Sequence, residues 1–526
     1  MAAAIIGIVL SSQSHPGWAQ EAPAKTPGKT RHPTGSTPKS PPRITPSKTT
    51  TKILGPLDED GYVDYVAALN EIYGRDVTLG NNAGLLFVRA SRIDGFGAAE
   101  RKRFFELLHC EPLPEQGDYL ADLDECTRTR LGRPASKSEE QDRDRAMRGP
   151  WSAQDLPLVA QWIEFNDKPL HLIVEGTLRP KCYFPFVLRK GECLFDMLIP
   201  AVQASRTAER LLLARAMLNL RNGHIEQAEN DLLACHRLGR LIGTTPFAIG
   251  ALVGLAIDSE TCVGDIALMS CDQLSAKGAL AYQRELRGLA PLPRVDELMD
   301  QCERFAYLQA LGIIARPKAL NGERSAIFKD LPPMISETTL LDWSEVLEVG
   351  NEQFDKAVAI LREPSIPRRR AAWGRFHREF LALREEARRS AFDKLPSGNR
   401  LSRKTMSGEF GKIMIASFFP AVIPVSENEN RLQARWVLDQ VGFALTAYWA
   451  AHGTYPKDLS ELVPHDIAKI PTDPFTEQPL HYECRPDGFT LSSVASNGID
   501  DVSAALPGKD WSDDLVIKVV RSARKP

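Results

Sequence analysis

Apolar residues recur at helical spacing through most of the chain. Val66, Leu69 and Ile72 in "DYVAALNEIYG" share one helical face, and that helix is expected to end at Gly74. "ERKRFFELLHC" is a second amphipathic helix, whereas the apolar runs "GLLFVRA" and "LHLIVEG" fit either a buried helix or a strand. Further helices are expected over residues 294–315, 340–362 and 368–394.

The helical signal is strongest from Leu194 to Met269. "SRTAERLLLARAMLNLRNG" and "HIEQAENDLLACHRLGRLIG" predict two amphipathic helices joined at Asn222-Gly223. Within 205–243, small and large residues follow the order typical of a tetratricopeptide hairpin: Ala214, Leu218, Gly223, Ala228 and Leu232. A solenoid needs about three stacked repeats. We therefore expect a mainly α-helical domain of hairpins over 57–400 and no repeat array.

The stretch "YWAAHGTYPKDLSEL" predicts a structural joint between a long helix and the sheet that follows it. A long helix with one apolar face precedes Gly453, which is placed to end it in a left-handed conformation. Pro456 prevents the helix from continuing, and Asp458 with Glu461 forms a capping box that begins a short second helix. Tyr455 is expected to pack back on the end of the first helix.

The periodicity then changes to that of strands. In "LHYECRPDGFTLSSV" apolar and polar residues alternate on both sides of Pro486-Asp487-Gly488, which predicts a β-hairpin, and "DDLVIKVV" supplies a third strand. The expected fold class is therefore mainly α. A helical-hairpin domain is followed by a small α+β module over 411–520, with one long helix and an antiparallel sheet.

This module resembles the head domain of the type II secretion major pseudopilin. The matching features, in chain order over 411–518, are an apolar segment from Ala416 to Pro424, a helix with "ALTAY", the break at Gly453, "PTDPF", a hairpin and an Asp-rich loop. No G-F-T-x-x-E processing site precedes the apolar segment. The resemblance thus implies the head fold without a polymerising pilin subunit. The rest of the chain resembles uncharacterised bacterial envelope proteins.

In the pseudopilin family the C-terminal loop binds calcium. The equivalent loop here contains Asp500, Asp501, Asp510, Asp513 and Asp514. Such carboxylates suit a hard cation that takes six to eight oxygen ligands, although Ala504-Ala505-Leu506 interrupts the acidic pattern. A solvated acidic loop is the alternative. If calcium binds, it is expected to raise the melting temperature, and an Asp513→Ala change should remove that shift.

The N-terminal residues indicate export. Met1 to Leu10 is a short apolar run, and small residues at Gly17 and Ala19 suit cleavage after Ala19, so residues 1–19 are predicted to be a signal peptide. A plain disordered N-terminus is the alternative, because a basic first segment is missing. Residues 20–56 are predicted to be an extended linker, since 21–56 hold eight prolines, seven Lys or Arg and one acidic residue.

Charge and hydropathy limit the kinds of partner that the chain is expected to bind. The net charge of −3 over 526 residues gives no reason to expect nucleic acid, and no stretch has the roughly 18 apolar residues of a membrane span. From Arg368 to Arg389 there are eight arginines and three glutamates. We expect a solvated face with Arg–Glu pairs there, with an acidic partner as the alternative.

Motifs of nucleotide binding, zinc proteases and nucleophile elbows do not occur in the sequence. Glu164, Asp167 and His171 lie close together in "WIEFNDKPLHL" and suit acid–base chemistry, but a structural role is favoured because no nucleophile accompanies them. The nine cysteines include two candidate disulfides, Cys182–Cys193 and Cys110–Cys126.

A second group of residues suits a metal. Cys235-His236 and His224, with Cys262 or Cys271, carry ligand types of a zinc site, although their spacing fixes no geometry. Core or surface positions are the favoured interpretation, and no cofactor is expected apart from the calcium above.

These patterns favour a non-enzymatic exported protein of the periplasm or cell envelope, whose module serves protein contact or assembly. This hypothesis predicts protein partners, apolar grooves on helical surfaces and no cluster of perturbed ionisable groups. One alternative is a periplasmic hydrolase with a site between the helical domain and the module, where Glu164, Asp167 or His171 converge. The other alternative is a calcium-dependent adhesion or assembly module.

Overall fold

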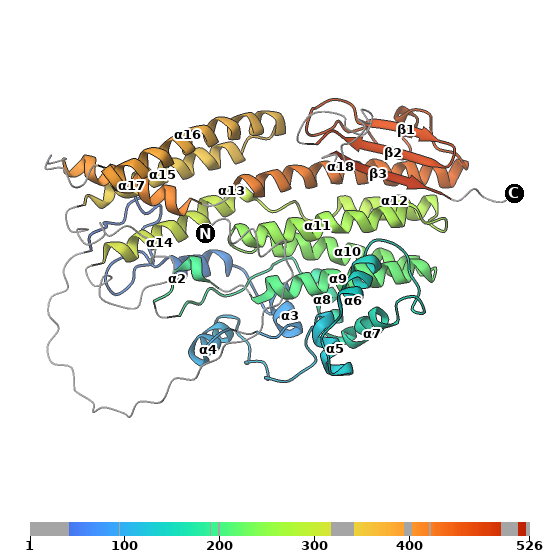
Figure 1. The fold of residues 1–526 in the computed structure, drawn as a ribbon, viewed down its shortest axis with the longest axis horizontal. Coiled ribbons are helices and arrows are strands. Elements are labelled where there is room, and N and C mark those ends of the chain that lie inside the picture. The colour runs from blue at the N-terminus through green and yellow to red at the C-terminus, as the bar shows by residue number, and fades with distance from the viewer. Residues whose placement is uncertain are drawn as a thin grey trace.

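The computed structural model describes residues 42–93, 95–189, 191–197, 200–316, 341–393, 402–419, 422–495 and 514–521. Within these ranges the predicted fold class is confirmed, because the chain is mainly helical with a small antiparallel sheet near its C-terminus (Figure 1). Short helices come first along the chain: α2 (Tyr65–Tyr73), α3 (Ala83–Ala90), α4 (Ala98–Leu107), α5 (Leu123–Leu131), α6 (Lys137–Ala146), α7 (Pro157–Phe165) and α8 (Asp167–Thr177). The apolar runs that fitted helix or strand are the helices α3 and α8.

Longer helices follow and build the body of the molecule. They are α9 (Pro200–Arg221), α10 (Ile225–Gly243), α11 (Ala248–Met269), α12 (Ala276–Arg287), α14 (Arg304–Ala315), α15 (Trp343–Leu361), α16 (Ile366–Asp393), α17 (Arg403–Phe418) and α18 (Val422–His452). Two short single turns are the 3-10 segments η1 (Leu194–Asp196) and η5 (Leu459–Leu462). The helix expected over 294–315 is interrupted, since α13 (Val295–Leu298) passes through a π-helical segment, Met299–Glu303, before α14 begins.

Residues 42–56 pack against the helical body, which corrects the expected linker of 20–56. The Asn351 side-chain amide donates to the carbonyls of Thr49 and Thr50 at 2.8 and 2.7 Å. The Tyr65 hydroxyl donates to the carbonyl of Thr51 at 3.0 Å, and Ile44 is buried in the core. Backbone carbonyls of a polar segment are thus satisfied by side chains distant in sequence. The predicted signal peptide and the rest of the linker lie outside the described residues.

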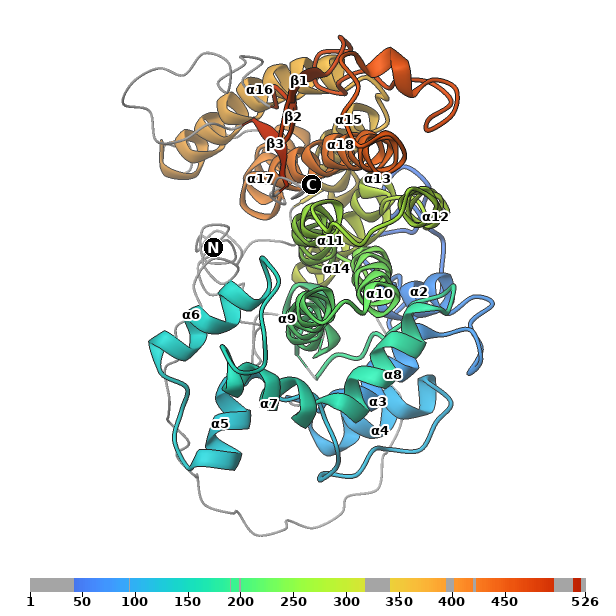
Figure 2. The same cartoon turned by 90° about the vertical axis from the view of Figure 1, so that its right-hand side faces the viewer.

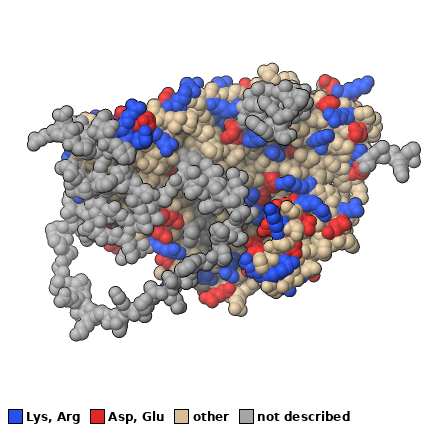
Figure 3. Space-filling view, in the orientation of Figure 1, with Lys and Arg blue, Asp and Glu red and all other residues tan. Residues whose placement is uncertain are grey.

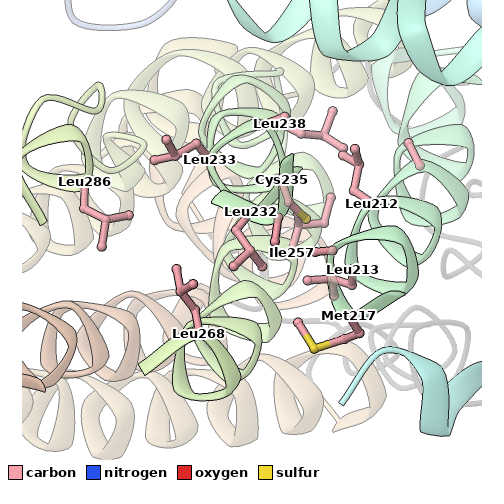
Figure 4. Close-up of a cluster of buried hydrophobic side chains, with 14 of the residues drawn as sticks. Leu212, Leu213, Met217, Leu232, Leu233, Cys235, Leu238, Ile257, Leu268 and Leu286 are labelled. Carbon is pink, nitrogen blue, oxygen red and sulfur yellow. The ribbon is translucent and has the colours of Figure 1, made fainter. Parts of the chain in front are cut away.

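The predicted hairpin of α9 and α10 is confirmed, and α11 continues it. Gly223 turns the chain with φ +75°, a conformation that glycine adopts without strain. Buried side chains from α9 to α12 interlock around this group of helices (Figure 4); they are Leu212, Leu213, Met217, Leu232, Leu233, Cys235, Leu238, Ile257, Leu268 and Leu286.

Three glycines let α10 and α11 touch at backbone distance. A Cβ atom on Gly254 of α11 would lie 2.4 Å from the Gly243 nitrogen and 2.5 Å from the Gly239 carbonyl oxygen, both on α10. This close approach brings side chains one turn away on the two helices within hydrogen-bond reach, including those of the buried network described below.

Gly254→Ala is therefore expected to lower the free energy of unfolding by about 1–3 kcal/mol, because backbone atoms cannot swing aside as side chains do. Gly312→Ala on α14 is the matched control, since nothing lies within 4 Å of its added Cβ. That change should stabilise by up to about 1 kcal/mol through helix propensity. Chemical denaturation compares the two variants, and equal effects would contradict the close-contact explanation.

Helices α14 to α17 enclose a second core cluster. Its aromatic residues pack against each other, with Phe376, Phe380 and Phe354 around Phe419 at ring-centroid distances of 5.6, 4.7 and 5.4 Å. Among the described helices none alone is long and apolar enough to cross a membrane. The bent pair α17 and α18 passes that test together, by length and composition only.

The module is built on α18. Its sheet has the order β1 (His481–Arg485), β2 (Gly488–Ser493) and β3 (Leu515–Val520), all antiparallel, with Cys484 opposite Phe489 and Leu491 opposite Ile517. The predicted hairpin and third strand are confirmed. β2 and β3 lie on α18, whose other side packs on α11 and α12 (Figure 2), so module and helical body share one core.

The expected joint after α18 is also confirmed. α18 ends at His452, Gly453 has φ +76°, and the Asp458–Glu461 capping box begins η5. Tyr455 is 6% exposed and packs back on Trp449, with ring centroids 6.3 Å apart.

Candidate functional site

The residues predicted to bind calcium cannot be placed as a group. Asp500, Asp501, Asp510 and Asp513 lie outside the described residues, and Asp514 directly precedes β3. Among the described residues there is no group of three or more His, Cys, Asp or Glu arranged to hold a metal ion. The calcium hypothesis therefore stays a prediction.

The candidate acid–base residues do not converge. Glu164 on α7 and Asp167 and His171 on α8 are exposed, and no hydrogen bond or ion pair joins these three side chains. Figures 1 and 2 place α7 and α8 on the far side of α9–α11 from the sheet. This part of the chain is held by buried Asn166, whose side chain accepts from the Ala121 amide at 2.8 Å. The site expected between the helical domain and the module is not formed by these residues.

The predicted disulfides are absent as well. All four cysteines involved keep their thiols, and the Cys193 thiol donates to Asp196 at 3.3 Å. Between Cys182 and Cys193, Gly191 has φ +89°, and residues 182–189 form no strand.

A buried ionic network does lie where the helical body meets α18. His236 of α10 stands between two aspartates of α11, with Nδ1 2.6 Å from Asp258 Oδ1 and Nε2 3.0 Å from Asp265 Oδ2. A carboxylate only accepts hydrogen bonds, so both imidazole nitrogens carry a proton and His236 is an imidazolium. The three side chains are 0% exposed.

Neighbouring helices complete this network. Arg240 of α10 donates through Nε to Asp258 Oδ2, and its guanidinium lies 4.3 Å from the centre of the Trp436 ring. Trp436 of α18 in turn donates from Nε1 to Asp258 Oδ1 at 3.3 Å. From α12, the Tyr282 hydroxyl donates to Asp265 Oδ1 at 2.6 Å. Four helices thus meet at two carboxylates.

Asp439 is the remaining acid of the cluster and also comes from α18. Burial and the nearby charge of Asp265 raise the pKa of Asp439 well above its usual value. The cations His236 and Arg240 thus lie beside the carboxyl groups of Asp258, Asp265 and Asp439 in one buried cluster.

The pKa values follow from these contacts. Burial by itself would lower the pKa of His236, but the charges and hydrogen bonds of Asp265 and Asp258 outweigh it and raise the pKa to about 10. Burial would raise the pKa of Asp258, and His236 and Arg240 reverse that effect and lower it. The prediction that the chain has no cluster of perturbed ionisable groups is therefore wrong.

The network is sealed from solvent. Asp439 is 2% and Arg240 6% exposed, which leaves no room for a substrate beside the imidazolium. The nearby thiols of Cys235 and Cys262 are buried, and burial raises the pKa of each well above its usual value, so neither is an activated nucleophile. The suggested metal group is not assembled either, because both His236 nitrogens are engaged by aspartates.

One signal in the sequence pointed to this network. Asp258 and Asp265 are seven residues apart in the strongly apolar "AIGALVGLAIDSETCVGDIALM", so they share one face of a buried helix. Acids on such a face require partners. The sequence indicated His236 only as a candidate metal ligand. No local pattern identified Asp439 as a member of the network.

A surface cleft of about 330 Å³ opens between α2 and α4. Buried Leu85 and Leu108 line it together with Arg103 of α4. The side-chain amide of Asn70 already has a structural partner, since its Oδ1 accepts from the Tyr183 hydroxyl at 2.7 Å. The cleft has the volume of a small-ligand pocket but no converging buried polar groups left to select a ligand.

Comparisons of this chain with protein-family models, curated proteins and solved structures find no match. The resemblance of residues 411–518 to the pseudopilin head therefore stays a prediction from sequence.

Stability is expected to fall as the pH rises through the neutral range. Burial raises the pKa of Glu209 from 4.5 to about 7, so the folded protein keeps a proton that the unfolded chain has released, and stability falls across this interval. The contribution of charged His236 is complete below pH 6.5 and is lost as the pH rises through about 10. Glu209 and His236 thus both make the folded state less stable as the pH rises.

Melting temperatures measured from about pH 5 to about pH 9 should therefore decrease steadily. In Glu209→Gln the melting temperature should fall less steeply up to about pH 7. Its decrease at alkaline pH depends on His236 and should be unchanged. A melting temperature that rises across this range would contradict the assignment.

Proposed function

We propose that this protein is a non-enzymatic envelope protein in which a pseudopilin-like module is mounted rigidly on a helical body and makes contact with a protein partner. The observation that carries the proposal is the sealed network, which ties Trp436 and Asp439 of α18 to α10 and α11. An ionic group closed to solvent fixes orientation and register, as buried polar groups do in other helical assemblies.

The rigid mounting leaves one side of the module for a partner. Strand β1 is at the edge of the sheet and mostly exposed, whereas β2 is buried along its whole length. Glu483 and Arg485 form an exposed ion pair at 2.9 Å on β1. Charged side chains on a short edge strand discourage unspecific sheet pairing, so contact with a chosen partner would use their side-chain surface.

Cys484 provides a direct test, because it is the exposed cysteine among the nine. A photo-crosslinker attached to this thiol in the full-length protein should capture a defined partner from intact cell envelopes. The matched control carries Cys484→Ser and places a cysteine on α6 by Ser138→Cys, an equally exposed site far from the sheet.

The proposal requires the same partner to be captured from Cys484, to be missing from the α6 control, and to be lost when Glu483→Arg is added. Equal products from both positions would contradict contact through the module. Loss of the partner without calcium would instead favour the calcium-dependent assembly hypothesis.

A further inference from the structure

The surface cleft between α2 and α4 has mostly apolar walls that stay open to solvent. Buried Leu85 and Leu108 line it, and so does Leu79, which is 51% exposed. Covering such surface removes it from water, which favours a ligand with apolar side chains. The volume of about 330 Å³ lies at the small end of the range for ligand pockets, so the cleft fits a molecule of one or two amino-acid residues.

The rim of the cleft supplies the polar contacts that its buried residues lack. Glu71 of α2 lies on one side, and Arg103 and His109, on α4 and just after it, lie on the other. All three side chains are exposed. Among the described residues, the side chains of Glu71 and His109 form no hydrogen bond or ion pair. Arg103 is joined to Glu106 by a contact of 3.4 Å between exposed side chains, which is a weak pair.

The charge of Arg103 acts inside the cleft. Burial raises the pKa of Tyr183 to about 12, and the positive charge of Arg103 opposes that rise. The Tyr183 hydroxyl is fixed to the α2 side of the cleft, because it donates to Asn70 Oδ1 at 2.7 Å. A carboxylate that enters between α2 and α4 therefore meets the field of the Arg103 guanidinium.

His109 has a backbone conformation that glycine adopts without strain. Its φ is +56°, and it is the left-handed residue of a Schellman motif that ends α4. In this motif the Cys110 amide donates to the Phe105 carbonyl at 3.1 Å, and the His109 amide donates to the Glu106 carbonyl at 3.1 Å. A side chain at this position costs stability, and strain of this kind is concentrated at functional sites. The strain thus places the imidazole of His109 on the cleft at the expense of stability.

We propose that the cleft between α2 and α4 binds a small zwitterion with apolar side chains, of the size of a dipeptide. The carboxylate of the ligand pairs with Arg103 and accepts a hydrogen bond from His109, and its ammonium group pairs with Glu71. Its side chains cover Leu85 and Leu108. Figure 3 shows basic and acidic side chains intermingled on the visible face, so no broad field of one sign there attracts a ligand of high net charge.

This inference goes beyond the contact made by the module and does not depend on it. Figures 1 and 2 both place α4 at the end of the molecule opposite to the sheet. Dipeptide binding uses the α2–α4 cleft, whereas partner capture uses β1, so each experiment can fail without the other.

Isothermal titration calorimetry with the full-length protein tests the proposal. Leucyl-leucine, valyl-leucine and alanyl-leucine are the ligands, and N-acetyl-leucyl-leucine amide, which lacks both charges, should bind at least tenfold more weakly than leucyl-leucine. Arg103→Gln and Glu71→Gln should each weaken leucyl-leucine binding about fivefold. Lys102→Gln is the matched control, because Lys102 is an exposed neighbour on α4 that does not line the cleft, and it should leave binding unchanged.

His109→Gly separates binding from folding. The melting temperature should rise, because glycine relieves the left-handed strain, while leucyl-leucine binding should weaken about threefold through loss of the imidazole. Failure of all three dipeptides to bind, equal binding of the blocked dipeptide, or an equal loss in Lys102→Gln would overturn the proposal. Tighter binding of decanoate than of the dipeptides would also overturn it, in favour of a fatty acid.

Discussion

Replacing Asp258 by alanine is expected to lower the free energy of unfolding by about 3–5 kcal/mol. The change removes the acceptor of His236, Arg240 and Trp436 at once. The two cations then remain buried with only Asp265 to balance them, and an uncompensated buried charge is more costly than the loss of the pair itself. Chemical denaturation at neutral pH measures the effect.

The size of this effect distinguishes the buried network from surface ion pairs. Arg133 and Glu139 form a bidentate pair of similar length, with contacts of 2.8 and 2.7 Å, but Arg133 is 48% exposed. Glu139→Ala should therefore cost about 1 kcal/mol or less for the ion pair, plus up to about 1 kcal/mol for its capping box. If Asp258→Ala cost no more than Glu139→Ala, the network would not be what fixes α18.

A second readout separates charge from packing. Asp258→Asn keeps the shape of the side chain but removes its charge, so the pKa of His236 should fall from about 10 towards its ordinary value. The stability lost at alkaline pH should shrink accordingly. An unchanged pH profile would show that His236 is held in its charged form by Asp265 alone.

The architecture could be predicted largely because its signals are local. The turn at Asn222-Gly223, the stop at Gly453 and the capping box of Asp458 with Glu461 each depend on residues within one helical turn. The hairpin between β1 and β2 follows from alternation and a turn, for the same reason. Such features depend on neighbouring residues alone, and the structure contains each of them.

The network and the N-terminal packing depend on distant partners. Asp258 and Trp436 are 178 residues apart, and Asn351 binds Thr50 across 301 residues. Periodicity identifies a buried acid on α11, but not which helix supplies its cation. Likewise, the proline-rich composition of residues 20–56 predicts an extended chain, whereas residues 48–51 form a turn. It gives no sign that its carbonyls meet Asn351 and Tyr65.

The second large effect is expected at Arg521, which joins the end of the sheet to the helical body. Its Nη2 donates to the Met269 carbonyl at 2.6 Å, and its Nη1 donates to the Cys271 carbonyl at 3.2 Å. Its Nε donates to the Tyr455 hydroxyl at 2.9 Å, and the guanidinium lies 3.8 Å from the centre of the Trp449 ring. A cation at the C-terminus of α11 also complements the helix dipole.

Arg521→Ala is expected to lower the free energy of unfolding by about 2–4 kcal/mol. The buried Met269 carbonyl loses its donor, which costs about 1–3 kcal/mol, and the contacts with the Tyr455 hydroxyl and the Trp449 ring are lost as well. Tyr455→Phe removes only the hydroxyl acceptor and should cost about 0.5–1.5 kcal/mol. The double variant Arg521→Ala, Tyr455→Phe should lose less free energy of unfolding than the two single variants together. Both single changes remove the same Arg521–Tyr455 hydrogen bond, which the double variant can lose only once.

The joint at Tyr455 then has a purpose beyond ending a helix. It presents a hydroxyl to Arg521, which connects the end of β3 with the last turn of α11. Arg521→Lys tests this arrangement, because a lysine keeps the charge but not the planar fork, which reaches four acceptors, including Asp272 Oδ1 at 3.0 Å. We expect Arg521→Lys to recover less than half of the stability lost in Arg521→Ala. Full recovery would show that charge at the helix end, and not the fork, holds the module to the body.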